Sequence, residues 1–186
     1  MEFKSVEKVS EGKFISFYNL HYETKAHQKK IYEMISRNHA ITSLEDLHDK
    51  RADAVVLIME NKSHDKILLN KEYRMAVGEW VYNFPAGLIE SGELLEVAAD
   101  RELFEETGLR IVEIDEVLGE SYSAVGFSNE KNVCVLGVAD GQFHESSSPL
   151  EEIEAGWFSR EEVRALLRTE RFAARTQAYL YLWAKR

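Results

Sequence analysis

One segment constrains the fold more than any other, a run of helix-forming residues that stops directly before Gly108. Glycine readily takes the left-handed conformation that follows many helix ends, so the sequence predicts a helix over Leu94–Thr107. Helical residues turn by about 100° each, which places three acidic residues on one face. These are Glu102, Glu105 and Glu106, while the apolar stripe that can pack on a sheet consists of Leu95, Ala99 and Leu103.

The three glutamates of this face repel one another. Each like-charged pair four residues apart costs a helix about 0.2–0.5 kcal/mol, and crowded carboxylates raise one another's pKa. One interpretation is a solvated acidic face in a chain of net charge −10. The other is a divalent cation, because carboxylate oxygens are preferred ligands of Mg²⁺ and Mn²⁺, and substrate phosphates commonly complete such sites. Glu93 is the expected partner of Arg101 near the start of the helix.

The spacing around the helix favours the cation. Gly87 is followed six positions later by Glu93, and the remaining fixed positions are Arg101-Glu102-Leu103, Glu105-Glu106 and Gly108-Leu109. With average residue usage, nine such positions match by chance on the order of once in a billion starting points or less. The segment resembles the Nudix box, G-x5-E-x7-R-E-U-x-E-E-x-G-U with U aliphatic, and meets every fixed position.

The resemblance extends over roughly residues 50–186. Glu72-Tyr73-Arg74 and Phe84-Pro85-Ala86-Gly87 are similar to the approach to the box in ADP-ribose pyrophosphatases and nucleotide-sugar hydrolases. Downstream, Ser123–Glu130 resembles their catalytic loop, and Glu152–Phe158 their C-terminal pattern. The resemblance implies an α/β fold, a Nudix α/β/α sandwich with a mixed sheet over residues 51–186. Residues 1–50 would form a small antiparallel β lobe that helps the chain to form a homodimer.

The resemblance also implies a reaction and a site. Nudix enzymes hydrolyse a nucleoside diphosphate linked to another group, by attack of water on phosphorus. The implied ligands of Mg²⁺, or of Mn²⁺, are Glu102, Glu105, Glu106 and the backbone carbonyl of Ala86. Arg101, with Glu93 beside it, would orient the carboxylates, and Glu130 would be the general base. Arg74 is the candidate for binding the substrate phosphates, because a guanidinium matches phosphate oxygens bidentately.

Two departures from the subfamily pattern concern the substrate. Val125 stands where ADP-ribose pyrophosphatases tend to carry a proline, and Asn83 stands where they usually carry a glutamate. Neither change touches the implied metal ligands, but pocket shape and a few polar contacts set discrimination between substrates. We expect ADP-ribose, cleaved to AMP and ribose 5-phosphate. The alternatives are another nucleotide sugar such as GDP-mannose, and a non-catalytic Nudix domain that binds a nucleotide, which usually lacks box glutamates.

The rest of the chain predicts strands with interspersed helices. Residues 13–36 are rich in β-branched and aromatic types and predict two antiparallel strands, although Ile31, Met34 and Ile35 also fit a helix. Further helices are expected after the capping box at Ser159–Glu162 and over Phe172–Ala184. The expected strands of the second part are Ala54–Met59, Lys66–Asn70, Trp80–Phe84, Ile111–Leu118, Val133–Ala139 and the region of Trp157-Phe158.

Composition narrows the partners. Lys plus Arg is 23 and Asp plus Glu is 33, and an acidic surface repels nucleic-acid backbones and anionic lipids. We therefore expect a small-molecule nucleotide substrate and neither nucleic-acid nor membrane partners. Cys134 is the only cysteine, so no internal disulfide forms, and the longest apolar run, Ala54–Met59, is far too short to span a membrane. These features, with an N-terminus that lacks an apolar signal region, predict a cytoplasmic location.

Overall fold

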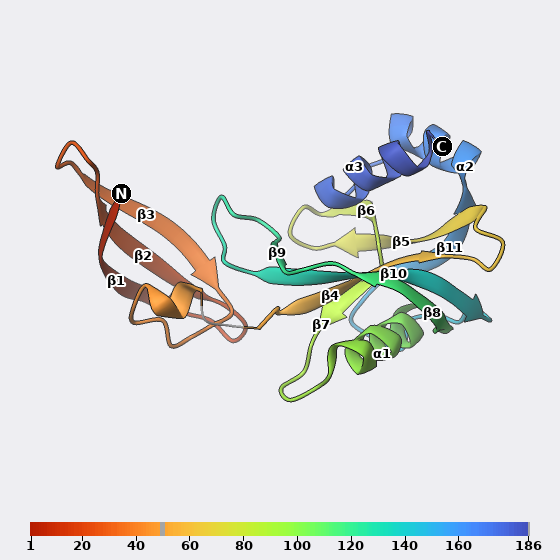
Figure 1. The fold of residues 1–186 in the computed structure, drawn as a ribbon, viewed down its shortest axis with the longest axis horizontal. Helices are drawn as coiled ribbons and strands as arrows, with labels where there is room; N and C mark the ends of the chain where they lie inside the picture. Colours follow the sequence, from red (N-terminus) through yellow and green to blue (C-terminus); the bar gives the residue numbers. More distant parts are fainter. Residues whose placement is uncertain (49–50, 186) are drawn as a thin grey trace. The chain divides into compact units, whose positions relative to one another are not determined.

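The computed structural model describes residues 1–48 and 51–185, which form two compact units (Figure 1). Unit 1 comprises Met1–Asp53 and Glu120–Asn132, and unit 2 comprises Ala54–Gly119 and Val133–Arg186. The segment Glu120–Asn132 is thus grouped with the N-terminal residues. The predicted boundary between residues 50 and 51 borders residues 49 and 50, which lie outside the described residues.

Unit 1 is built on a three-stranded antiparallel sheet in the order β1-β2-β3. Its strands are β1 (Glu2–Glu11), β2 (Ser16–Glu23) and β3 (Lys29–Ser36). Alternate residues of β2 are buried, and Tyr18, Leu20 and Met34 pack with residues near the 3₁₀ helix η1 (Glu45–Leu47). The predicted antiparallel strands are therefore confirmed, and the helical alternative for Ile31, Met34 and Ile35 is wrong. The largely exposed strand β1 was not predicted, because its charged residues carry no apolar alternation.

The catalytic-loop segment identified in the sequence belongs to unit 1. The short strand β9 (Ser121–Tyr122) pairs with Lys131 and Asn132, the first residues of β10 (Lys131–Gly141). Between these strands, the carbonyl of Phe127 accepts a hydrogen bond from the backbone N–H of Ile35 at 2.8 Å. This bond attaches the loop to strand β3.

Unit 2 contains a sheet with the strand order β11-β5-β4-β10-β8. Two further strands extend it, β6 (Glu79–Asn83) along β5 and β7 (Ala86–Leu88) along β4. The remaining strands are β4 (Ala54–Glu60), β5 (Lys66–Arg74), β8 (Leu109–Val117) and β11 (Ile153–Ser159). Every strand predicted for this part is present, to within a few residues at its ends.

Helices cover both faces of this sheet (Figure 1). Helix α1 (Leu95–Thr107) packs on one face, and α2 (Arg160–Thr169) and α3 (Ala174–Trp183) pack on the other. Strand β4 contacts the helices on both faces. Val55 and Leu57 belong to the cluster that contains α1, whereas Val56 and Ile58 belong to the cluster that contains α2 and α3. Both faces of β4 are buried, as its continuous apolar run predicts. The expected α/β sandwich with a small antiparallel N-terminal sheet is confirmed.

The helix ends follow the local signals in the sequence. Gly108 has a φ of 84°, and its N–H bonds to the carbonyl of Phe104 at 2.8 Å, which ends α1 as predicted. Ser159 and Glu162 form the predicted reciprocal capping box of α2. Within the described parts of the chain, no helix is both long and apolar enough to cross a membrane.

Candidate active site

The box residues of unit 2 run from strand β7 into helix α1, and their closest approach is at Gly87. A Cβ atom at this position would lie 1.9 Å from Oε2 of Glu102. No side chain larger than hydrogen therefore fits here unless the carboxylate moves away. Glycine at the start of the box lets the backbone of β7 pass directly beside a carboxylate of α1.

Arg101 connects four groups around the start of α1. Its Nε and Nη2 donate to the two carboxylate oxygens of Glu93 at 2.8 and 2.9 Å, and Nη2 also donates to the carbonyl of Leu88 at 3.0 Å. Nη1 donates to Glu102 at 2.7 Å and to Glu105 at 3.1 Å. The guanidinium lowers the pKa of Glu93 to about 2. Arg101 therefore holds one side of the box in a network of charge-assisted hydrogen bonds.

Glu106 lies in a different environment. Its Oε2 accepts hydrogen bonds from Nδ2 of Asn70 at 2.7 Å and from the backbone N–H of Ala86 at 3.2 Å. Burial raises the pKa of Glu106 well above its ordinary value, and the nearby charges of Glu72 and Glu102 raise it further. This carboxylate is thus deeply placed and crowded by other acids, and no arginine contacts it directly among the bonds of the described residues.

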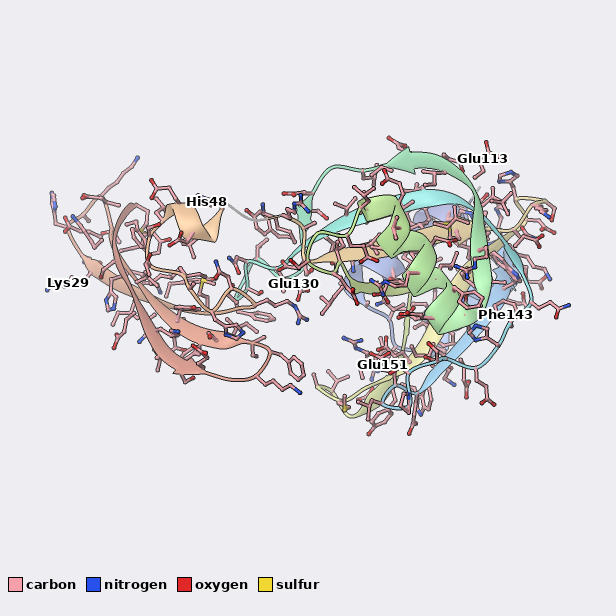
Figure 2. The ribbon with its side chains drawn as sticks, turned by 90° about the horizontal axis from the view of Figure 1, so that it is seen from below. Lys29, His48, Glu113, Glu130, Phe143 and Glu151 are labelled. Atoms are coloured by element: carbon pink, nitrogen blue, oxygen red, sulfur yellow. The ribbon has the colours of Figure 1, made fainter. Side chains whose placement is uncertain are left out.

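Glu102 and two acids from outside the box complete the crowded region. Burial raises the pKa of Glu102, although Arg101 opposes the effect. Glu151, labelled in Figure 2 on the segment that leads to β11, raises the pKa of both Glu102 and Glu106. Sequence reasoning assigned no role to Glu151 or to Glu72. For Glu72 the available signal was its place in Glu72-Tyr73-Arg74, and for Glu151 it was the acidic pair after Pro149.

The donor set fits a divalent cation, but the carboxylates are not yet gathered around one point. Within residues 1–48 and 51–185, no group of three or more His, Cys, Asp or Glu side chains is arranged to hold a metal ion. Existing partners explain this, since Arg101 holds Glu102 and Glu105, and Asn70 and Ala86 hold Glu106. Partly buried carboxylates with raised pKa values are nevertheless the groups that a cation would stabilise, and hard oxygen donors suit Mg²⁺ or Mn²⁺.

Two predicted residues have ion-pair partners of their own. Arg74, at the end of β5, donates through Nη1 to Oε1 of Glu72 at 2.5 Å. Glu130 belongs to unit 1, where its Oε2 accepts a 2.8 Å bond from Nε of Arg37 and its N–H donates to Oγ of Ser128 at 3.0 Å. Glu130 is labelled in Figure 2. The structure therefore gathers Glu93, Arg101, Glu102, Glu105, Glu106 and Ala86 in unit 2, and places Glu130 in the other unit.

Asn83 and Val125, the two residues that depart from the subfamily pattern, differ in their surroundings. Oδ1 of Asn83 accepts a 2.7 Å hydrogen bond from Oγ1 of Thr176 in α3, so its side chain links β6 to that helix. Val125 is 71% exposed. Tyr18 is completely buried in unit 1 and donates to the carbonyl of Asn38, so its ring is not available to stack on a substrate base.

Comparisons with known proteins agree with this architecture. A family model described as the NUDIX domain matches residues 49–180. A crystal structure of an ADP compounds hydrolase superposes with a TM-score of 0.74 at 21% identity, covering 100% of this chain and 94% of that one. At this identity the likeness concerns the fold.

Curated relatives share part of their length with this chain. An ADP-sugar pyrophosphatase of Mus musculus is 36% identical over 109 residues, 57% of this chain and 47% of that protein. An NAD-capped RNA hydrolase of Mycobacterium tuberculosis is 32% identical over 147 residues, 79% of this chain and 45% of that protein. A nudix hydrolase of Caenorhabditis elegans is 28% identical over 163 residues, 87% of this chain and 69% of that protein. The chain thus spans about half the length of the first and second of these.

Proposed function

The chain belongs to the NUDIX domain family, and from this premise we propose that it hydrolyses the pyrophosphate of a nucleoside diphosphate linked to a sugar. The proposed substrate is ADP-ribose, and the products are AMP and ribose 5-phosphate. The carrying observation is the crowded acidic region of unit 2, in which Glu102 and Glu106 are only partly exposed, Glu102 lies directly against the backbone of Gly87, and desolvation raises the pKa of both carboxylates. A merely solvated acidic face would show neither burial nor such shifts.

A divalent cation supports this reaction by neutralising the pyrophosphate and by lowering the pKa of an attacking water. We propose Mg²⁺, with Mn²⁺ as a substitute, held by Glu102, Glu105, Glu106 and the carbonyl of Ala86. Arg101 supports the site because its bonds to Glu93 on one side and to Glu102 on the other fix the orientation of that carboxylate.

Phosphate binding is assigned to Arg74. Its guanidinium now pairs with Glu72, and a substrate phosphate would compete for the same donors. Because both side chains leave part of their surface in solvent, this pair is weak enough to open.

The general base is proposed to be Glu130, as the resemblance implies, and Glu151 is the second candidate. Glu130 has its own cationic partner in Arg37. Glu151 acts electrostatically on Glu102 and Glu106 within the same unit. A base must reach the attacking water within hydrogen-bond distance, so substitution of each residue decides between them, as set out in the Discussion.

The names of the relatives support an adenine-containing substrate. One acts on ADP-sugars, another is described as an ADP compounds hydrolase, and a third acts on NAD-capped RNA. A pyrophosphate that links adenosine to a second group is common to all three descriptions. GDP-mannose remains the alternative substrate because Asn83 and Val125 depart from the ADP-ribose pattern.

A substrate panel tests the proposal. Product formation would be followed for ADP-ribose, GDP-mannose, UDP-glucose, NADH and NAD-capped RNA, with Mg²⁺ and with a chelator. We expect metal-dependent release of AMP, fastest from ADP-ribose. Faster turnover of GDP-mannose would move the assignment to the alternative sugar, and faster turnover of the capped RNA would overturn the expected absence of a nucleic-acid substrate. Ligand-induced stabilisation without any product would support a non-catalytic nucleotide-binding domain.

We also propose a cytoplasmic homodimer, in which the sheet of unit 1 takes part in subunit contact. The supporting observations are the extra antiparallel sheet before the Nudix domain and the presence of only one cysteine, Cys134, so that no internal disulfide forms. Light scattering at micromolar protein should give twice the chain mass of 21.4 kDa. A monomeric mass would contradict the dimer without affecting the proposed reaction.

A further inference from the structure

We propose that Asn70 is a positioning residue for the metal site, holding the Glu106 carboxylate in the orientation that presents its free oxygen to the cation. This inference rests on the proposed function, since it concerns the same site. Asn70 lies at a position in β5 that the box pattern does not include, and sequence reasoning gave it no role.

The hydrogen bond from Asn70 to Glu106 selects one oxygen of the carboxylate. Nδ2 of Asn70 donates to Oε2 of Glu106 at 2.7 Å, the short end of the range for N–H···O hydrogen bonds. The N–H of Ala86 donates to the same oxygen at 3.2 Å. Two donors on Oε2 leave Oε1 as the oxygen without either of these bonds, so Asn70 and Ala86 together determine which oxygen is available to a ligand.

The free energy of unfolding does not explain why an asparagine lies at position 70. The residue is only 2% exposed, and its Oδ1 is buried without a hydrogen-bond partner in the described parts of the chain. A buried unsatisfied carbonyl is destabilising, and a leucine of similar shape would avoid it. Its neighbours along β5, Leu68 and Leu69, are apolar and completely buried. An amide that is buried at the end of the apolar stretch Ile67–Leu69 is therefore best explained by its bond to Glu106.

Asn83 offers a matched comparison on the neighbouring strand. It pairs with Asn70 in the register of β5 and β6, but its amide accepts a hydrogen bond from Thr176 and has no bond to a box residue among those of the described chain. Two asparagines on adjacent strands thus have different partners, one in the metal site and one in α3. The same substitution at both positions separates positioning from general loss of an amide.

The test measures Mn²⁺ binding to the full chain by the electron paramagnetic resonance signal of free Mn²⁺, without substrate. Asn70→Leu should weaken Mn²⁺ affinity about tenfold or more, the range seen when a group supporting a metal ligand is lost. Its melting temperature should change little, because loss of the unsatisfied Oδ1 offsets loss of the donor to Glu106. Asn83→Leu should keep the affinity and lower the melting temperature, because the hydroxyl of Thr176 loses its acceptor. Asn70→Ala should weaken affinity as Asn70→Leu does, which guards against a packing effect of the leucine.

A kinetic readout accompanies the binding assay. With ADP-ribose, Asn70→Leu should raise the Mg²⁺ concentration needed for half-maximal rate and leave the KM for substrate at saturating Mg²⁺ unchanged. Unchanged Mn²⁺ affinity in both Asn70 variants would overturn the positioning role while the proposed function stands. If the wild-type chain itself bound no Mn²⁺, the proposed metal site and this inference would fall together.

Discussion

Two glutamates of unit 2, Glu93 and Glu106, show how differently the same residue type can be used. At one side of the box, Glu93 faces Arg101, and its pKa is lowered to about 2. At the other side, Glu106 faces Asn70, Ala86 and further carboxylates, and burial raises its pKa well above the ordinary value. In the first region, the charges of Glu93 and Arg101 balance each other without a ligand. The second becomes favourable only when positive charge is added.

This contrast assigns separate tasks to the two regions. The Arg101 side is a fixed support, since a bidentate guanidinium–carboxylate pair restricts both side chains. The Glu106 side stores unfavourable electrostatic energy that a bound cation would relieve. A further arginine-paired acid, Glu130 with Arg37, occurs in unit 1. The following predictions test whether pairing with arginine marks the supporting acids of unit 2 and crowding marks its metal-binding acids, with the arginine-paired Glu130 of unit 1 tested separately as the proposed base.

The largest effect expected outside the metal site concerns the general base. Glu130→Gln should lower kcat about 100-fold or more and leave Mn²⁺ affinity unchanged, because a base acts on the attacking water. Glu151→Gln should have a smaller effect on kcat. Steady-state kinetics with ADP-ribose and the Mn²⁺ titration measure both quantities.

The reverse result would sharpen the comparison. A large loss of kcat in Glu151→Gln with near-normal kcat in Glu130→Gln would transfer the role of base to Glu151 and leave Glu130 as a structural partner of Arg37. Glu96→Gln is the matched control, because Glu96 is an exposed acid of α1 outside the fixed box positions.

The second prediction concerns Arg101, which supports the box on the side of Glu93. Arg101→Gln removes bonds to Glu93, Glu102 and Glu105 and should lower the free energy of unfolding by about 1–3 kcal/mol. Activity should fall at least about tenfold because Glu102 loses its orientation. Urea unfolding and kinetics measure the two effects.

Arg110→Gln is the control for this change. Arg110 pairs with Asp100 at 2.7 Å, but both side chains are well exposed, so stability should change by less than about 0.5 kcal/mol. Equal destabilisation by the two substitutions would show that Arg101 is an ordinary surface ion pair.

The third prediction concerns pH and has the smallest effect. The raised pKa of Glu106 means that its charged form destabilises the metal-free fold, and this penalty is relieved as pH falls through the raised folded pKa toward the ordinary value of 4.5. Glu106→Gln should therefore melt about 2–4 °C above wild type at pH 7 in chelator. The difference should narrow as pH is lowered toward 5.

The contribution of Glu93 to stability depends on pH with the opposite sign. Its lowered pKa gives stability that is present above about pH 4.5 and is lost as pH falls toward 2. Glu93→Gln should accordingly destabilise the protein at pH 7, with a difference that disappears in acid. Melting curves of both variants across pH 3–7 measure this. A destabilised Glu106→Gln at pH 7 would contradict the crowding that distinguishes the two regions.

Much of the fold follows from local signals. Helix formers before Gly108 predict α1, the Ser159–Glu162 box predicts the start of α2, and the apolar run beginning at Ala54 predicts a strand buried on both faces. Strand β1 escapes such reasoning because its pairing with β2, and not its own pattern, makes it a strand. β-propensity depends strongly on neighbouring strands.

The candidate site likewise contains residues that local patterns identify and residues that they do not. Box spacing identifies the acids of α1, because one helix determines their common face. Asn70 and Glu151 contribute through contacts with residues more than thirty positions away, which no local pattern reveals. The only local sign at Asn70 is a polar residue at the end of an apolar stretch. The ion pair of Glu130 with Arg37 is likewise set by the packing of unit 1.

The most direct test of the central claim is the rate of ADP-ribose hydrolysis by wild type, Glu106→Gln and Glu96→Gln, each with Mg²⁺ and with chelator. We predict that wild type and Glu96→Gln release AMP and ribose 5-phosphate only with Mg²⁺, and that Glu106→Gln is slower by about 1,000-fold or more. Turnover by Glu106→Gln at the wild-type rate, or wild-type turnover that persists in chelator, would contradict the assignment of the crowded acids as the metal site of a hydrolase.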